Sequence, residues 1–228
     1  MNKKTNMKAV KNVTTTLLNM QPKISELHPD IVQHPVFLSR INIINRETLD
    51  ITEVEGFKKA TEYFEDMIKR RTTAHQCLLM LRNPYYLTFF GFIKNDLSTE
   101  DYNELLGECW TEEEFPNADI DVPVSVSAEW FRDADKKVLM NDSEYEYYLN
   151  LPDSFEIYRG VPEGKTPNGM SWTRKYDKAK WFANRFGSGY VIKGIAKKKD
   201  VLTFFNRRGE EEVVIEAKNI LNKENMKD

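Results

Sequence analysis

The sequence is poor in cysteine and histidine, with two and three residues respectively in a chain of 228. Cys77 and Cys109 are too few for a disulfide scaffold or a zinc cluster, and they are typical of buried thiols in a reducing compartment. His28, His34 and His75 are widely spaced and belong to no HExxH motif, so the sequence offers no set of metal ligands. We therefore expect a protein that works without a metal.

Long apolar runs are also missing. The most apolar segment, Cys77–Ile93, is interrupted by Arg82, Asn83 and Pro84, which excludes a membrane span. The first twenty residues are basic but contain no continuous apolar region of the kind found in signal peptides. The chain has 33 basic and 36 acidic residues, so a general attraction to nucleic acid or anionic lipid is not expected. These features predict a cytoplasmic protein that binds neither nucleic acid nor membranes.

The composition is otherwise that of a folded protein, with 40% hydrophobic and 12% aromatic residues. The charge is distributed unevenly, because residues 151–228 contain 16 basic and 11 acidic side chains while residues 1–150 contain 17 and 25. Together with scattered prolines near the start, this predicts a partly ordered N-terminal arm at 1–50, a helical lobe at 51–150 and a core at 151–228. We expect residues 51–228 to form one compact domain.

Apolar periodicity predicts that helices dominate the first part of the chain. Apolar residues recur at three- and four-residue steps from Ile51 to Arg71, and Ser98 resembles the cap of a further helix. Two more helices are expected at 126–140 and 143–149. Residues 77–93 suit either a helical hairpin or two strands, and we favour the hairpin. The acidic segment from Glu108 to Pro123 is expected to be a loop.

Strands are predicted after residue 150. The expected strands are Phe155–Arg159, Tyr190–Ala196, Val201–Phe205 and Glu212–Glu216. Between the first two, Ala179, Phe182, Ala183 and Phe186 form one apolar helix face that ends at Gly187. Helices followed by strands indicate an α+β architecture.

Three consecutive glutamates precede the last of these strands. Residues two apart in a strand share a face and lie about 6.5–7 Å apart, so Glu210 and Glu212 should project together and Glu211 should point away. Two carboxylates at that separation can divide the work of glycosidic chemistry, one stabilising a cationic sugar and one handling a proton. The alternative for such a run is a solvated hairpin tip.

Two other short segments carry suitable polar groups. Arg159 could hold a phosphate with its planar guanidinium, and Gly160 would allow a ligand to approach the backbone. Ser171 and Thr173 alternate along a short segment, so their hydroxyls could bond one of the carboxylates. An ordinary ion-paired arginine and a Ser/Thr pair chosen for β propensity are the alternatives.

The order of these pieces resembles the arginine–serine–glutamate class of ADP-ribosyltransferases. Tyr158–Gly160, Ser171–Thr173, an amphipathic helix and Glu210–Glu212 with an aliphatic run follow one another within Phe155–Glu216. The Ser-Trp-Thr form of the central motif and the helix segment Ala179–Ala183 are similar to small transferases encoded by bacteriophages. The resemblance implies a helical N-terminal lobe followed by a core of two packed, mainly antiparallel β-sheets around an NAD cleft.

The resemblance also implies a role for each position. Arg159 would bind the NAD diphosphate, and the Gly160 backbone would bond the nicotinamide amide. Ser171 would orient Glu212, which would accept a hydrogen bond from the ribose 2′-hydroxyl and stabilise the oxocarbenium ion as nicotinamide leaves. Glu210 would position and help to deprotonate the acceptor, as in arginine-modifying members.

Further residues follow from the same resemblance. The remaining candidates for NAD binding are Trp172, Thr173, Arg185 and Phe186. The segment Phe205–Gly209 falls where the family carries its target-recognition loop. Because three glutamates are consecutive, Glu211 could replace Glu210 or Glu212 in the pair.

The resemblance therefore implies an NAD-dependent mono-ADP-ribosyltransferase that modifies an arginine of a target protein without a metal. NAD is its co-substrate, and the target would be a host or bacterial protein, because the Lys-, Asn- and Ile-rich composition indicates a bacteriophage or bacterial origin. The protein would then act in the host cytoplasm. Two alternatives remain open: an NAD glycohydrolase, and a catalytically inert binding or virion module with the same fold.

Overall fold

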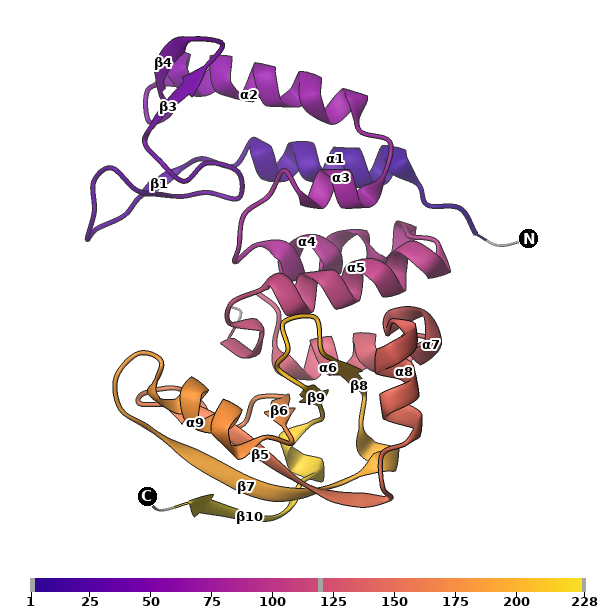
Figure 1. Ribbon diagram of the computed structural model, residues 1–228. Helices are drawn as coiled ribbons and strands as arrows, with labels where there is room; N and C mark the ends of the chain where they lie inside the picture. Colours follow the sequence, from indigo (N-terminus) through magenta and orange to yellow (C-terminus); the bar gives the residue numbers. More distant parts are fainter. Residues whose placement is uncertain (1–2, 119–120, 227–228) are drawn as a thin grey trace. The chain divides into compact units, whose positions relative to one another are not determined.

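The computed structural model describes residues 3–118 and 121–226 (Figure 1). The chain divides into two compact units, residues 1–114 and 115–228. This boundary differs from the expected one after residue 150, and residues 51–228 do not form one unit. The reason is that the helix at Asp142–Leu149 belongs with the sheet, since its Tyr145, Tyr147 and Tyr148 pack against the core of the sheet.

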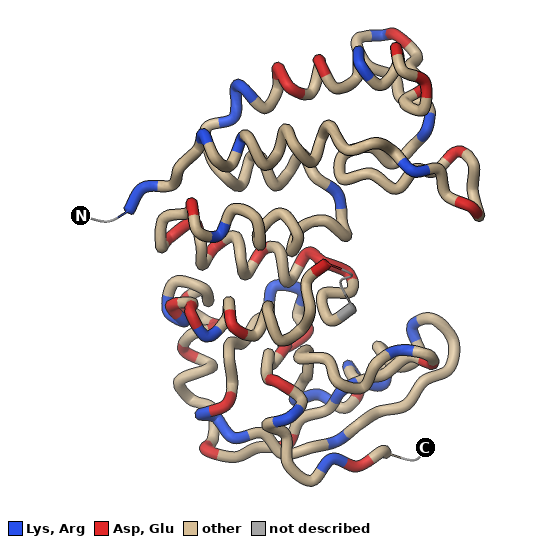
Figure 2. Tube along the Cα trace, turned by 180° about the vertical axis from the view of Figure 1, so that it is seen from behind, with Lys and Arg blue, Asp and Glu red and all other residues tan. Residues whose placement is uncertain are grey.

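The first unit is mainly helical. Its elements are α1 (Met7–Leu18), β1 (Lys23–Ile24), β2 (Val32–Gln33), β3 (Ile41–Ile44), β4 (Glu47–Asp50), α2 (Val54–Arg70), α3 (Ala74–Leu78), α4 (Tyr86–Ile93), the 3-10 turn η1 (Lys94–Asp96) and α5 (Thr99–Glu112). β1 pairs with β2 and β3 pairs with β4, both antiparallel. Acidic and basic residues occur along both units (Figure 2).

Helix α1 was not predicted, because its apolar residues are separated by polar ones. In a helix that spacing forms a single face, and Val10, Thr14, Leu17 and Leu18 are all buried. Asn6 caps the helix by accepting a hydrogen bond from the backbone N–H of residue 9 at 3.3 Å. The N-terminal arm is thus built around a helix with a buried face.

His34 has a structural place in this unit. Its Nδ1 accepts hydrogen bonds from the backbone N–H groups of Val36 and Phe37 at 3.0 and 3.1 Å. A backbone N–H can only donate, so the ring hydrogen is on Nε2, which faces the carbonyls of Leu18 and Met20. Burial lowers the pKa of His34 to about 4. The residue is a neutral core histidine.

The helix predictions for this unit are confirmed except at one boundary. α2 lies within the predicted 51–71 segment. Residues 77–93 contain the end of α3 and the whole of α4, with turns at 79–85 between them, so the helical alternative is confirmed over that of two strands. Ser98 caps α5 by accepting from the N–H of Asp101 at 3.1 Å. The loop predicted from residue 108 was wrong at its start, because Cys109 and Trp110 are buried and the helix continues to Glu112.

The second unit contains helices and strands. Its elements are η2 (Pro116–Ala118), α6 (Val124–Asp133), α7 (Lys136–Leu139), α8 (Asp142–Leu149), β5 (Ser154–Pro162), β6 (Ser171–Thr173), α9 (Tyr176–Asn184), β7 (Gly189–Lys197), η3 (Lys198–Asp200), β8 (Thr203–Phe205), β9 (Glu212–Val214), η4 (Ala217–Asn219) and β10 (Leu221–Met226). The predicted helix 126–140 is interrupted at residues 134–135. The α+β class is confirmed.

Among the described residues, six strands of this unit form one antiparallel sheet in the order β10-β7-β5-β6-β9-β8 (Figure 1). β5 and β7 pair along their whole length, from Ser154↔Lys197 to Pro162↔Gly189. In the same described part of the chain, β5 and β6 are joined by a single residue pair, Tyr158↔Thr173. The sheet therefore consists of two three-stranded halves with a narrow junction, where two separate sheets were expected.

Helix α9 packs closely on β5 and β7 (Figure 1). A Cβ atom on Gly160 would lie 2.0 Å from the carbonyl oxygen of Ala179, and one on Gly189 would lie 2.1 Å from that of Ala183. These glycines are needed because the helix backbone touches the sheet. The predicted apolar face is buried at its two alanines, whereas Phe186 lies beyond the helix end and is exposed.

In the described residues, we find no helix that combines the length and the apolar character needed to cross a membrane.

Candidate active site

Arg159 lies in the middle of the sheet, on β5. Within the described residues its side chain makes one hydrogen bond and no salt bridge, and that bond joins Nη1 to the carbonyl oxygen of Ser171 at 2.7 Å. The backbone of Gly169 covers the guanidinium so closely that a Cβ there would lie 2.3 Å from Nη2. The Nε atom is buried and has no hydrogen-bond partner, although the residue as a whole keeps partial exposure.

The electrostatics of Arg159 are unusual for an arginine. Burial lowers its pKa to about 10, and the negative charge of Glu212 acts in the opposite direction. A buried cation that lacks a paired carboxylate is costly in free energy. Its donors are those that hold carboxylate or phosphate groups through two parallel hydrogen bonds. Arg159 is thus a largely covered cation whose donors are of the kind that bind an anion.

Ser171 is the first residue of β6 and connects two parts of the unit. Its backbone carbonyl accepts the hydrogen bond from Arg159, and its hydroxyl oxygen accepts one from Nδ2 of Asn117 at 2.8 Å. Sequence reasoning missed Asn117, because it lies within the segment predicted to be an acidic loop. Asn117 is part of η2.

Trp172 and Thr173 complete β6 and point into the protein. Trp172 is 2% exposed, and its Nε1 donates to the carbonyl oxygen of Gly169 at 3.0 Å. The buried Thr173 hydroxyl donates to the backbone carbonyl of Glu210 at 3.1 Å. Both side chains hold the neighbouring loops in place.

The three glutamates do not alternate as expected. β9 begins at Glu212, so Glu210 and Glu211 precede it, and Glu211 has a left-handed backbone with φ of 48°. The prediction of a Glu210–Glu212 pair on one strand face was wrong in its premise, because alternation requires extended backbone at all three residues. Glu211 forms an ion pair with Lys175 at 2.5 Å, and its N–H donates to Oδ1 of Asn206 at 3.2 Å.

Glu212 is half-buried between two strands. It pairs with Thr173 on β6 and with Phe205 on β8, and its charge acts on Arg159. Arg159, Ser171 and Glu212 therefore lie on β5, β6 and β9, which are consecutive in the sheet. Arg159 is linked to Ser171 by a hydrogen bond and to Glu212 by electrostatic attraction.

The loop before Glu212 is anchored by a residue that sequence reasoning missed. Glu144 is buried at the start of α8, and its Oε1 accepts from the backbone N–H of Asn206 at 2.7 Å. Its other oxygen accepts from the N–H of Asn141, as part of a capping box. The sequence Asn-x-x-Glu at 141–144 predicts the helix cap, but it does not predict the hydrogen bond between Glu144 and Asn206.

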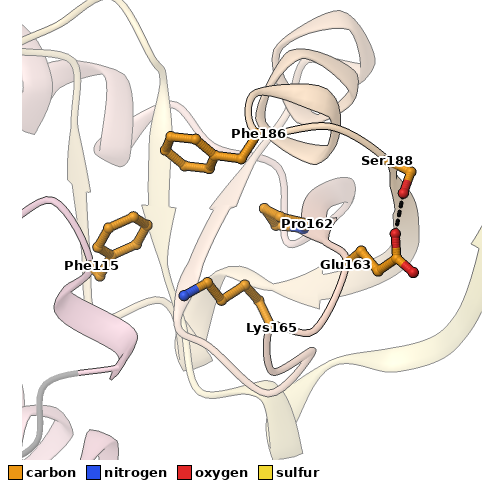
Figure 3. Close-up of a pocket in the computed structure, with 6 residues that line it drawn as sticks. All are labelled: Phe115, Pro162, Glu163, Lys165, Phe186 and Ser188. Atoms are coloured by element: carbon orange, nitrogen blue, oxygen red, sulfur yellow. Dashed lines mark hydrogen bonds between the residues drawn. The ribbon is translucent and has the colours of Figure 1, made fainter. Parts of the chain in front are cut away.

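A small pocket of about 220 Å³ lies in the same unit (Figure 3). Its lining residues are Phe115, Pro162, Glu163, Lys165, Phe186 and Ser188. The rings of Phe115 and Phe186 are 5.9 Å apart, and the Lys165 ammonium lies 5.0 Å from the centre of the Phe115 ring. Glu163 is hydrogen-bonded to Ser188 on the other side.

Of the residues predicted for the site, Phe186 alone lines this pocket. Arg185, the residue before it, lies over the Phe186 ring at 4.8 Å and over the Trp181 ring at 5.5 Å. Phe186 is 59% exposed and Phe115 is 41% exposed. The pocket thus presents two accessible aromatic rings and a lysine.

No group of three His, Cys, Asp or Glu side chains in the described ranges is arranged to hold a metal ion. Comparison of the chain with family models, curated proteins and solved structures finds no match in any of the three.

Proposed function

We propose that the protein is a mono-ADP-ribosyltransferase that acts in the cytoplasm of a bacterial host. It moves ADP-ribose from NAD to an arginine of a target protein and releases nicotinamide. The observation that carries the proposal is Arg159, a shielded guanidinium with an unpartnered Nε beside Ser171 and Glu212. An anionic diphosphate supplies the counter-charge that such a buried cation needs.

The division of the sheet supports an NAD cleft of the kind that the sequence resemblance implies. Arg159 belongs to the half made of β10, β7 and β5, whereas Ser171 and Glu212 belong to the half made of β6, β9 and β8. The two halves meet through the Tyr158↔Thr173 pair. Tyr158 directly precedes Arg159, and Thr173 is also the residue that pairs with Glu212 on β9. A ligand at this junction would touch both halves.

Each residue has a distinct task in this scheme. Arg159 holds the diphosphate through its planar donors and so orients the nicotinamide ribose. The Glu212 carboxylate stabilises the positive charge that develops on the ribose as the bond between C1′ and nicotinamide breaks. The new bond joins C1′ to a guanidine nitrogen of the target, which loses one proton. Because nicotinamide is a good leaving group, positioning and electrostatics carry the reaction.

The glutamate loop favours a second candidate, an NAD glycohydrolase. Glu211 is held by Lys175 in a left-handed conformation, so Glu210 is not presented beside Glu212 by strand alternation. A hydrolase needs only the Glu212 side of the pair, because water replaces the acceptor. We retain transfer as the main proposal, since Glu210 is held next to β6 through the Thr173 hydroxyl.

The test is an incubation of the protein with labelled NAD, with and without a bacterial lysate. The proposal predicts nicotinamide release and label on arginine side chains of lysate proteins, found by mass spectrometry of peptides. Nicotinamide release at the same rate without any labelled protein would instead identify the glycohydrolase. An inert module would show neither product and no saturable NAD binding by calorimetry.

A further inference from the structure

Asn117 contacts two consecutive residues, Met170 and Ser171, through both ends of its amide, and Ser171 belongs to the proposed site. Its Oδ1 accepts from the backbone N–H of Met170 at 2.5 Å, and its Nδ2 donates to the Ser171 hydroxyl oxygen at 2.8 Å. The orientation of the amide is fixed, because a backbone N–H can only donate and must therefore face the oxygen. The amide hydrogen is then directed at Ser171.

The segment that Asn117 holds is the one that shapes the surroundings of Arg159. The carbonyl of Ser171 accepts the hydrogen bond of the guanidinium, and Gly169 covers the same group. The carbonyl of Met170 accepts from the N–H of Ile215, just beyond β9. Asn117 thus holds the segment Met170–Ser171, which is hydrogen-bonded to Arg159 on one side and to Ile215, just after β9, on the other.

The donor from Asn117 also decides what the Ser171 hydroxyl can do. A hydroxyl has one hydrogen and two lone pairs. When a lone pair is occupied by an N–H donor, the hydroxyl hydrogen turns away from that donor and is available to an acceptor elsewhere. Ser171 is therefore set as a hydrogen-bond donor on the side away from Asn117, the role needed to orient a carboxylate.

We propose that Asn117 is a positioning residue of the active site. It sets the Ser171 hydroxyl as a donor and holds the Ser171 carbonyl against Arg159. The inference rests on the proposed function, because it assigns Ser171 a part in turnover of NAD. It extends the site to a segment outside the three motifs on which the resemblance depends.

Two substitutions separate the two contacts. Asn117→Ala removes both, so NAD affinity and kcat should each fall. Asn117→Asp keeps an oxygen facing the Met170 N–H but places a second oxygen against Ser171, which must then donate its hydrogen to Asp. In Asn117→Asp we expect kcat to fall about five- to tenfold, the effect of one misdirected hydrogen bond, with KM for NAD and the thermal midpoint close to wild type.

A double-variant comparison with Ser171→Ala tests whether Asn117 acts through the serine. If it does, adding Asn117→Asp to Ser171→Ala should lower kcat little further. Asn225→Asp on β10, an exposed residue at the far edge of the sheet, is the matched control for the added charge and should be silent.

The outcomes are distinct. If Asn117→Asp has the kcat of the wild type, Asn117 has no positioning role. The same conclusion follows if the decreases in kcat of the two single variants multiply in the double variant. Neither result would affect the NAD activity of the wild type. A wild-type protein that neither binds nor cleaves NAD would overturn the proposed function and, with it, this inference.

Discussion

The guanidinium of Arg159 donates to the backbone carbonyl of Ser171 across the narrow junction of the sheet, with 2.7 Å between Nη1 and the oxygen. This bond connects the two three-stranded halves beside their single β-pair, Tyr158↔Thr173, in the described part of the chain. It also uses only part of the donor set of Arg159, because Nε is left without a partner. The bond fixes the arginine, and in the proposed function its remaining donors would hold the NAD diphosphate.

Replacement of Glu212 tests the electrostatic part of the mechanism. Glu212→Gln keeps the shape of the side chain but removes the charge that would face the ribose. Loss of one preorganised electrostatic contact lowers kcat by about 10²–10³, while NAD affinity should change much less. The rate of nicotinamide release under saturating NAD gives the answer. Turnover close to wild type would remove Glu212 from the mechanism.

The neighbouring glutamates should behave differently from each other. Glu210→Gln should abolish transfer to arginine and leave slow NAD hydrolysis, because water needs less activation than a guanidine. Glu211→Gln should leave both activities almost unchanged, because its carboxylate is engaged with Lys175. Parallel assays of label transfer and nicotinamide release distinguish them. A severe catalytic loss in Glu211→Gln would show that Glu211 belongs to the catalytic pair.

The need for glycine at position 160 can be explained by packing, and this explanation can be tested separately from ligand binding. In Gly160→Ala the new methyl group would meet the carbonyl of Ala179, so α9 must shift. Overpacking of this kind costs about 1–3 kcal/mol in the free energy of unfolding, measurable by urea denaturation. Unchanged stability combined with lost NAD binding would instead assign the glycine to the ligand.

The stability of the first unit should depend on pH through His34. Its pKa is lowered from 6.5 to about 4, so between these values the unfolded chain binds a proton that the folded protein does not. The free energy of unfolding therefore has its full value, as far as His34 is concerned, above pH 6.5, and it decreases as the pH falls towards 4. From pH 7 to pH 5 the loss amounts to about 2 kcal/mol.

Urea unfolding of the wild type and His34→Gln at both pH values isolates this contribution. The variant has no titrating ring, so its free energy of unfolding should fall less than that of the wild type over the same interval. Identical falls in the two proteins would show that His34 is not the group responsible.

The sequence was sufficient where local periodicity determines structure. α2, α5 and the strands β5, β7, β8 and β9 follow from apolar spacing, and Ser98 is a recognisable cap. The exposed strand β10 has no apolar pattern and was not predicted. It was insufficient where distant segments meet. The contact of Asn117 with residues 53 and 54 positions later has no local signature. The left-handed backbone of Glu211 is likewise set by its partners Lys175 and Asn206, which the alternation rule ignores.

The unit boundary was missed for a similar reason. The charge of the chain changes sign near residue 150, but packing follows apolar contacts, and the tyrosines of α8 bury themselves against the sheet. Charge patterning reports the surface of a protein, and it does not report which elements share a core.

The most direct test of the central claim is a calorimetric titration of NAD into the wild-type protein, Arg159→Lys and Arg132→Lys. Arg132 is paired with Glu216 on the surface and serves as the matched control. We predict saturable binding to the wild type and to Arg132→Lys, and affinity about 10- to 100-fold weaker in Arg159→Lys, which keeps the charge but loses the two-pronged donor geometry. Equal affinity in all three proteins, or no binding to the wild type, would contradict the assignment of Arg159 as the anchor of an NAD site.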